Sequence, residues 1–204
     1  MFIQYLTQDP SFYFSTILLV MFSICLHELA HAWTALRCGD STAADAGHMT
    51  LNPLVQMGPV SMVILAVIGI AWGAVPIDPR ALTRGRRALV AAAGPATNLG
   101  LCLGFGLAAG LALRWGGTEF TFRILFWASM LNGVLFLFNM LPVPPLDGWT
   151  VLGLFVRATD RLDPAMARQV ATMGLLVLFL SPATGYLWAA GEFLALRAVG
   201  LVGI

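Results

Sequence analysis

Charged residues are scarce in this 204-residue chain, and lysine is missing altogether. Asp, Glu and Arg make up only 10% of the sequence, against 59% hydrophobic residues, and the mean hydropathy is +0.84. Soluble domains carry about 25% charged residues, so this chain has too little polar surface for a water-soluble fold. Its net charge of +1 gives no support for nucleic-acid binding. The composition therefore predicts an integral membrane protein in contact with a lipid bilayer.

Cysteine is also rare, and a cleavable leader is not recognisable. The three cysteines, Cys25, Cys38 and Cys102, stand at unrelated spacings, which argues against a disulfide framework or a four-cysteine zinc cage. No basic residue precedes the first apolar run, and no small-residue cleavage site follows it. We therefore expect this run to stay in the protein.

Four apolar stretches are long enough to cross a bilayer, which takes about 20 residues of helix. They are residues 12–36, 88–113, 121–141 and 170–195, all approximate. The connections between them are too short to form a further domain. The sequence therefore predicts an all-α polytopic membrane protein with a single domain over 1–204, made of a core at about 12–150 and a C-terminal helix at 170–195.

A fifth apolar stretch, about 59–74, decides the topology because it is shorter than the others. If it enters the membrane and returns, Arg114, Arg123 and Arg197 lie on one side and the other eight arginines on the opposite side. If it crosses, Arg37 changes sides and the division becomes seven to four. The positive-inside rule favours the re-entrant arrangement, with the arginine-rich side in the cytoplasm and the N-terminus outside.

The sequence HELAH, residues 27–31, places three ionisable side chains inside the first apolar stretch. His27 and His31 are four residues apart, so a helix presents both imidazoles on one face, where they can bind one zinc ion. Glu28 lies on a neighbouring face, close enough to take a proton from water at the metal without binding the metal. Burying these groups without a partner is costly, so a packing role is the weaker interpretation.

A catalytic zinc needs a third protein ligand and one open position. Asp147 is the leading candidate because it follows the proline-rich break LPVPPLDG, which fixes an extended path. In the re-entrant topology, His27 lies about nine residues, or roughly 14 Å, from the cytoplasmic end of its helix. Asp147 follows a span that ends on the same side, so the two motifs can meet. A simple turn after a span remains the alternative for Asp147.

With HELAH, GPATN (94–98) and NMLPVPPLDG (139–148) in this order, the chain resembles the site-2 protease family of zinc intramembrane proteases over roughly residues 20–150. The family element N-x-x-P-x-x-x-x-D-G is matched in full. The chain looks like the compact branch without a PDZ or CBS domain. The resemblance implies one Zn²⁺ per chain, bound by the two histidines of HELAH and by Asp147, with Glu28 activating the water.

The resemblance also suggests two amides for the site. Asn139 would lie near the metal, where it could hydrogen-bond an oxyanion or the substrate backbone. Asn98 is a weaker candidate for that role, and packing at a helix crossing is an equal alternative. His48 is expected at the surface. The chain departs from the compact branch at Gln56 and Gly58, where a histidine and an Asp-Pro are expected, which leaves the role of that loop open.

The implied function is hydrolysis of transmembrane helices by a multi-pass protease of a prokaryotic cytoplasmic membrane, with its site open to the cytoplasm. Because a membrane helix bonds every amide internally, its substrate must unwind locally. We expect segments 47–51 and 74–77 to be β-like and to receive the unwound substrate as an added strand. A regulatory membrane partner, trimming of the substrate by another protease, or access alone would control the reaction.

Other functions fit parts of the pattern. A membrane-anchored zinc protease could cleave juxtamembrane or soluble segments, and the position of the cleaved bond separates it from an intramembrane protease. A non-catalytic metal-binding or transport protein could use the same ligands, but would have no use for Glu28 as a base. An inactive scaffold is disfavoured because the His-Glu-His-Asp set is complete.

Overall fold

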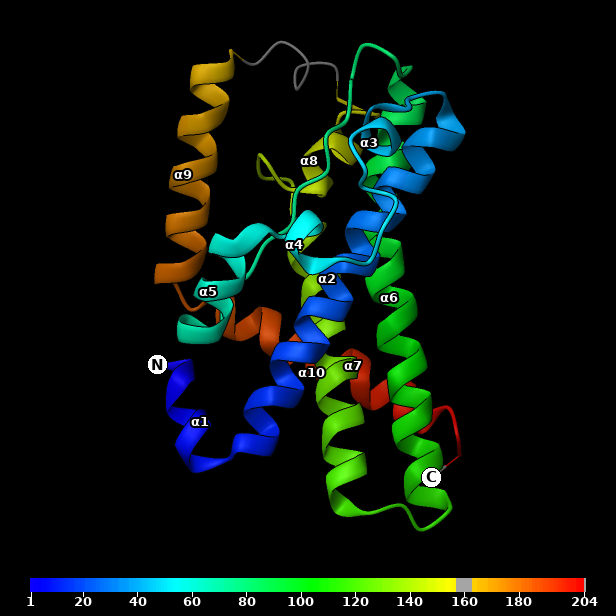
Figure 1. Ribbon diagram of the computed structural model, residues 1–204, viewed down its shortest axis with the longest axis vertical. Coiled ribbons are helices and arrows are strands. Elements are labelled where there is room, and N and C mark those ends of the chain that lie inside the picture. The colour runs from blue at the N-terminus through cyan, green and yellow to red at the C-terminus, as the bar shows by residue number, and fades with distance from the viewer. Residues whose placement is uncertain (157–162, 204) are drawn as a thin grey trace.

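A computed structural model describes residues 1–156 and 163–203, and its regular elements in these ranges are all helices. Among them, three are long and apolar enough to cross a membrane: α2 (Pro10–Cys38), α6 (Arg84–Arg114) and α7 (Glu119–Asn139). They run along the long axis of the molecule, and α6 packs against both others (Figure 1). The chain is therefore a helical integral membrane protein.

Local sequence sets the ends of these helices. Asp9 accepts a hydrogen bond from the backbone N–H of Phe12 at 3.0 Å and so caps the start of α2. Thr83 and Thr118 cap α6 and α7 with their hydroxyls in the same way. Helix α2 ends at Gly39, whose φ of 101° lies in the left-handed region that favours glycine.

The apolar stretch 59–74 enters the molecule as a short helix and returns. Helix α5 (Gly58–Ile68) has 11 residues, so it is about 16 Å long, roughly half the thickness of the hydrocarbon core. After Gly69 the chain runs back to the start of α6 without regular structure (Figure 1). There Arg86 Nη1 donates to the carbonyl of Cys38 at 3.1 Å. The end of α2 and the start of α6 thus lie together, which agrees with the re-entrant arrangement.

The described residues contain no strand, so segments 47–51 and 74–77 differ from the β-like pair that we expected. Buried Gln56 bonds the backbone of both segments instead, one through its side chain and the other through its own backbone. Its Nε2 donates to the carbonyl of His48 at 2.9 Å and to a second carbonyl in the same segment. The backbone carbonyl of Gln56 accepts the N–H of Ala74 at 3.0 Å. Gln56, a residue of the short helix α4 (Pro53–Gln56), joins the two segments through hydrogen bonds outside any ladder.

The C-terminal stretch is two helices, whereas we expected one span over 170–195. Helices α9 (Pro164–Leu180) and α10 (Ala183–Gly200) are separated by Ser181 and Pro182. Proline lacks an N–H and disfavours helical geometry in the preceding residue, and Ser181 is extended, with ψ of 166°. Helix α10 turns away from α9 and crosses behind α7 (Figure 1). The expected fourth span is therefore not a continuous helix.

Short elements complete the described fold. They are η1 (Phe2–Gln4), α1 (Tyr5–Gln8), α3 (Thr42–Asp45) and α8 (Asp147–Leu152). Helix α1 lies beside the start of α2, and η1 contacts α5. Tyr13 of α2 also bonds α5, since its hydroxyl donates to the carbonyl of Ala66 at 2.9 Å. Helix α8 packs against α6 and carries the aspartate of the proline-rich motif to the middle of the fold.

Candidate metal centre

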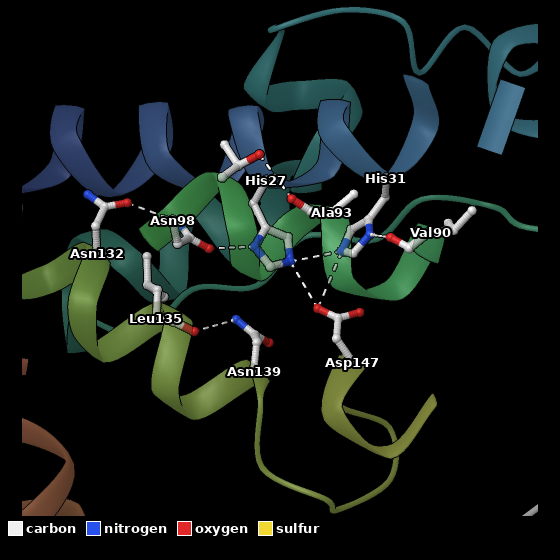
Figure 2. A network of polar contacts seen from close by, with 10 residues as sticks. His27, His31, Val90, Ala93, Asn98, Asn132, Leu135, Asn139 and Asp147 are labelled. Atoms are coloured by element: carbon white, nitrogen blue, oxygen red, sulfur yellow. Dashed lines mark hydrogen bonds and ion pairs between the residues drawn. The ribbon is translucent and has the colours of Figure 1, made fainter. Parts of the chain in front are cut away.

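Helices α2 and α8 bring three candidate metal ligands together. His27 Nε2 and His31 Nε2 lie 2.9 Å apart, and Asp147 Oδ2 lies 3.2 Å from the first and 3.3 Å from the second (Figure 2). A tetrahedral zinc with bonds of about 2.0–2.2 Å separates its ligand atoms by about 3.3 Å. The three donor atoms therefore have the spacing of one face of a zinc tetrahedron, and their chemistry, two imidazoles and a carboxylate, suits that metal.

The second nitrogen of each histidine ring contacts an oxygen from α6. His31 Nδ1 lies 2.8 Å from the backbone carbonyl of Val90, and His27 Nδ1 lies 2.5 Å from Asn98 Oδ1. A carbonyl can only accept, so Nδ1 of His31 carries the hydrogen and its Nε2 keeps a free lone pair. Helix α6 thus orients both rings toward Asp147.

Gly94 lets α6 approach the two histidines closely. A Cβ at this position would overlap Nε2 of both rings. Asn98 follows one turn later and faces His27. The GPATN motif therefore supplies the space and one of the two oxygens that orient the two histidine rings.

Glu28 is buried beside the candidate ligands but does not belong to the three-residue group that can hold a metal. Its carboxylate faces the returning segment after α5, since a Cβ at Gly73 would lie 2.5 Å from Oε1. The side chain lines the same cavity as the three candidate ligands. Glu28 is thus placed to exchange protons at the site without occupying a metal position.

A cavity of about 730 Å³ opens over these residues. The returning segment, the end of α7 and one residue of α9 enclose it with apolar side chains, among them Ile70, Trp72, Phe138 and Leu175. Asn139 also lines it, and its Nδ2 donates to the carbonyl of Leu135 at 3.0 Å. The polar groups thus lie in an otherwise apolar pocket of the size that binding sites have.

The remaining sequence candidates have other contacts. His48 is half-buried in the loop after α3, where its Nδ1 lies 3.1 Å from Gln56 Oε1. Both ends of the Asn98 amide are engaged, one with His27 and the other with Asn132 Oδ1 at 2.9 Å. These contacts favour a positioning role for Asn98 over the oxyanion role.

Asn132 and the Val90 carbonyl were not among the sequence candidates. Asn132 could have been noticed, because it stands seven residues before Asn139 on one face of a largely apolar helix. The Val90 carbonyl has no signal in the sequence, since every residue carries a backbone carbonyl and only the fold distinguishes this one.

Comparison with known proteins places the chain among peptidases. The model of peptidase family M50 matches residues 112–181. YwhC of Bacillus subtilis (strain 168), which is named as a candidate zinc metalloprotease, is 38% identical over 185 residues that cover 84% of this chain and 83% of YwhC. The chain belongs to peptidase family M50.

More distant M50 relatives are longer than this chain. Rip2 of Mycobacterium tuberculosis (strain H37Rv), also named as a candidate zinc metalloprotease, is 36% identical over 78% of this chain and 64% of Rip2. Rip3 of the same strain is 30% identical over 84% of this chain and 41% of Rip3. No solved structure matches the chain. The membership agrees with the resemblance to site-2 proteases that the three motifs carry.

Proposed function

We propose that this M50 peptidase is an intramembrane zinc endopeptidase that cleaves locally unwound transmembrane segments. Membership of M50 makes it a zinc metalloprotease, as its relatives are named. The finer proposal rests on one observation: the group of His27, His31 and Asp147, with Glu28 beside it, lies within and against a membrane-spanning helix. All four belong to the proposed catalytic core at about 12–150.

In this proposal each chain holds one Zn²⁺ through the Nε2 atoms of His27 and His31 and a carboxylate oxygen of Asp147. Zinc bound there supplies a Lewis acid that polarises the scissile carbonyl and makes the attacking water more acidic. Glu28 takes the proton of that water and passes it to the leaving amine. Asn139, whose amide lines the cavity, donates to the developing oxyanion or the substrate backbone.

The returning segment supports binding of an extended substrate. Ser61 Oγ donates to the carbonyl of Trp72 at 2.7 Å and accepts its N–H at 2.9 Å, and Gln56 accepts the N–H of Ala74. These bonds hold the segment against α4 and α5, while residues 70–75 also line the cavity. An unwound substrate can pair with the remaining backbone groups, as in strand addition.

The position of the site supports access from the arginine-rich side. Helix α2 ends 11 residues after His27, so the site lies about 16 Å from that end. Arg87, near the start of α6, lines the cavity. Arg157 and Arg161, which the charge count places on the same side, lie outside the described residues. With the positive-inside rule, the cavity opens to the cytoplasm of a prokaryotic cell, the N-terminus is outside, and a membrane partner can control access.

Co-expression with single-span membrane proteins tests this function. We expect the wild type to cleave at least one of them inside its apolar stretch, and Glu28→Gln to reduce cleavage at least about a hundredfold, the usual contribution of a general base, while zinc stays bound. Unchanged cleavage by Glu28→Gln contradicts the mechanism. Cleavage that mass spectrometry maps outside the apolar stretch favours the membrane-anchored alternative. Asp147→Ala should lower the zinc content of the purified protein.

A further inference from the structure

A chain of buried polar side chains leads away from His27 across three helices (Figure 2). Asn98 on α6 contacts His27 Nδ1 through its Oδ1 and donates from Nδ2 to Asn132 Oδ1 on α7 at 2.9 Å. Asn132 Nδ2 in turn donates to Ser23 Oγ on α2 and to the backbone carbonyl of Ala128, both at 2.9 Å. Asn98 and Asn132 are fully buried and Ser23 is 1% exposed, so water does not compete for these bonds.

The backbone carbonyl at the end of this chain fixes the direction of every bond in it. The Ala128 carbonyl can only accept, so the NH₂ group of Asn132 must face it and the oxygen of Asn132 must face Asn98. The oxygen of Asn132 can only accept, so the NH₂ group of Asn98 must donate to it. The oxygen of Asn98 therefore faces His27. Nδ1 of His27 must then carry the ring hydrogen, and Nε2 keeps its lone pair on the side of His31 and Asp147.

We propose that Asn132 is a positioning residue for zinc binding, acting through Asn98 on the tautomer of His27. The proposal rests on the assignment of His27 as a zinc ligand. Without the oxygen of Asn132, the amide of Asn98 can turn over and offer its NH₂ group to Nδ1. The ring hydrogen then moves to Nε2, the atom that would bind zinc, and metal affinity falls. Asn132 itself is neither one of the three candidate ligands nor a residue that lines the cavity.

A purely structural role is the competing explanation, because polar contacts between helices also stabilise membrane proteins. The same pair of helices offers a matched control. Ser129, one turn before Asn132 on α7, donates to the carbonyl of Cys102 at 2.7 Å, and Cys102 lies one turn after Asn98 on α6. Ser129 is as fully buried as Asn132. Its bond joins the same two helices but leads to no candidate ligand.

Zinc affinity of the purified full-length protein, measured in detergent by competition with a chelator, tests the proposal. We expect Asn132→Leu to weaken zinc binding about 10- to 100-fold, the usual effect of losing a group that orients a metal ligand. Ser129→Ala should stay within about threefold of the wild type, because its bond bypasses His27. Equal zinc affinities of Asn132→Leu and Ser129→Ala overturn the proposal.

Asn132→Asp separates positioning from stability. The aspartate keeps an oxygen for Asn98 at unchanged volume, so zinc affinity should stay close to that of the wild type even where the buried carboxyl lowers the melting temperature. A drop in its zinc affinity of more than about tenfold, in the range expected for Asn132→Leu, overturns the proposal without need of the leucine variant. In a protein that already carries Asn98→Ala, Asn132→Leu should not lower zinc affinity further, since Asn132 contacts His27 only through Asn98. Additive losses of zinc affinity would also overturn the proposal.

The ring hydrogen can be observed without metal or substrate. The chain has three histidines, so ¹⁵N NMR of histidine-labelled, zinc-free protein carries three ring signals. We expect His27 to hold its hydrogen on Nδ1 in the wild type and in Ser129→Ala, and to populate both tautomers in Asn132→Leu; a single Nδ1–H tautomer in all three contradicts the proposal. His27→Ala serves as the reference for the ligand itself. If His27→Ala keeps the zinc affinity of the wild type, the assignment of His27 as a ligand is rejected. If His27→Ala loses zinc affinity but Asn132→Leu keeps that of the wild type, only the positioning role of Asn132 is rejected.

Discussion

Gly94 leaves room for the two candidate histidine ligands because it has no side chain. A Cβ there would overlap Nε2 of both His27 and His31, and neither ring can move away freely because each is held at Nδ1. We expect Gly94→Ala to leave the helices folded but to lower zinc affinity by at least about 100-fold, at the upper end of what displaced ligand geometry costs. Chelator competition on the purified protein measures this loss.

Gly100→Ala is the matched control for that substitution. Gly100 lies on the same helix, and a Cβ there would meet nothing within 4 Å. Alanine should therefore stabilise α6 by up to about 1 kcal/mol and leave zinc binding unchanged. Similar zinc affinities for the two variants would show that α6 does not approach the histidines as closely as described.

The residues of the site differ in how far sequence could predict them. The spacing of His27 and His31 fixes their common helix face, and the proline-rich break marks Asp147; these three lie within contact of one another. The contacts of Asn98 could not be foreseen, because they depend on how α6 packs between α2 and α7. A polar residue in an apolar helix signals a buried contact, but sequence does not tell which atom it meets.

Ser61 of helix α5 holds the returning segment through two hydrogen bonds to Trp72. Its hydroxyl bonds both the N–H and the carbonyl of Trp72, and it is fully buried. We expect Ser61→Ala to leave both backbone groups without their partner, at a cost of about 1–3 kcal/mol each if they stay buried. The segment should then loosen, which faster hydrogen exchange around Trp72 would reveal.

Ser129→Ala again provides the comparison, since it removes a buried serine hydroxyl far from this segment. Exchange around Trp72 should match the wild type in that variant. If Ser61→Ala exchanges no faster than Ser129→Ala, the segment is held by its other contacts, such as the bond from Ala74 to Gln56.

The accuracy of sequence prediction also varied among the elements. Length and hydropathy predicted α2, α6 and α7 because each contains a long apolar stretch and is capped at its start. The C-terminal stretch has the same hydropathy, but Pro182 removes a hydrogen-bond donor in its middle and divides it. The segments around Gln56 look extended in sequence, yet the side chain of Gln56 bonds two carbonyls of segment 47–51 and no ladder forms among the described residues.

At the scale of the whole molecule, Asp40 ties three parts of the arginine-rich end together. It follows α2, accepts the N–H and hydroxyl of Thr42 at the start of α3, and accepts the N–H of Asp78 at 2.8 Å. Burial raises the pKa of this carboxyl, but these hydrogen bonds outweigh it, so the pKa is lowered. The charged form therefore stabilises the fold above the unfolded pKa of about 3.9, and this stability is lost as pH falls through the folded pKa.

Thermal unfolding of zinc-free protein between pH 7 and pH 3 checks this effect. Asp40→Asn should be less stable than the wild type at pH 7, because an amide cannot accept all three bonds. The difference should shrink below about pH 4, where the wild-type carboxyl also becomes protonated. A constant difference across the range would mean that the charge of Asp40 contributes nothing.

The re-entrant path makes a prediction for the whole protein in its membrane. Asp45 and Arg80 flank the stretch 59–74 and are exposed, and Glu119 is exposed at the other end of α6. Each can be changed to cysteine in a chain whose three native, buried cysteines are replaced by serine. If the stretch returns, cysteines at 45 and 80 react with a membrane-impermeant thiol reagent only after the cells are opened, and the cysteine at 119 reacts in intact spheroplasts. Reaction at 45 but not at 80 in intact spheroplasts would require the stretch to cross, and the end of α2 and the start of α6 would then face opposite sides of the membrane.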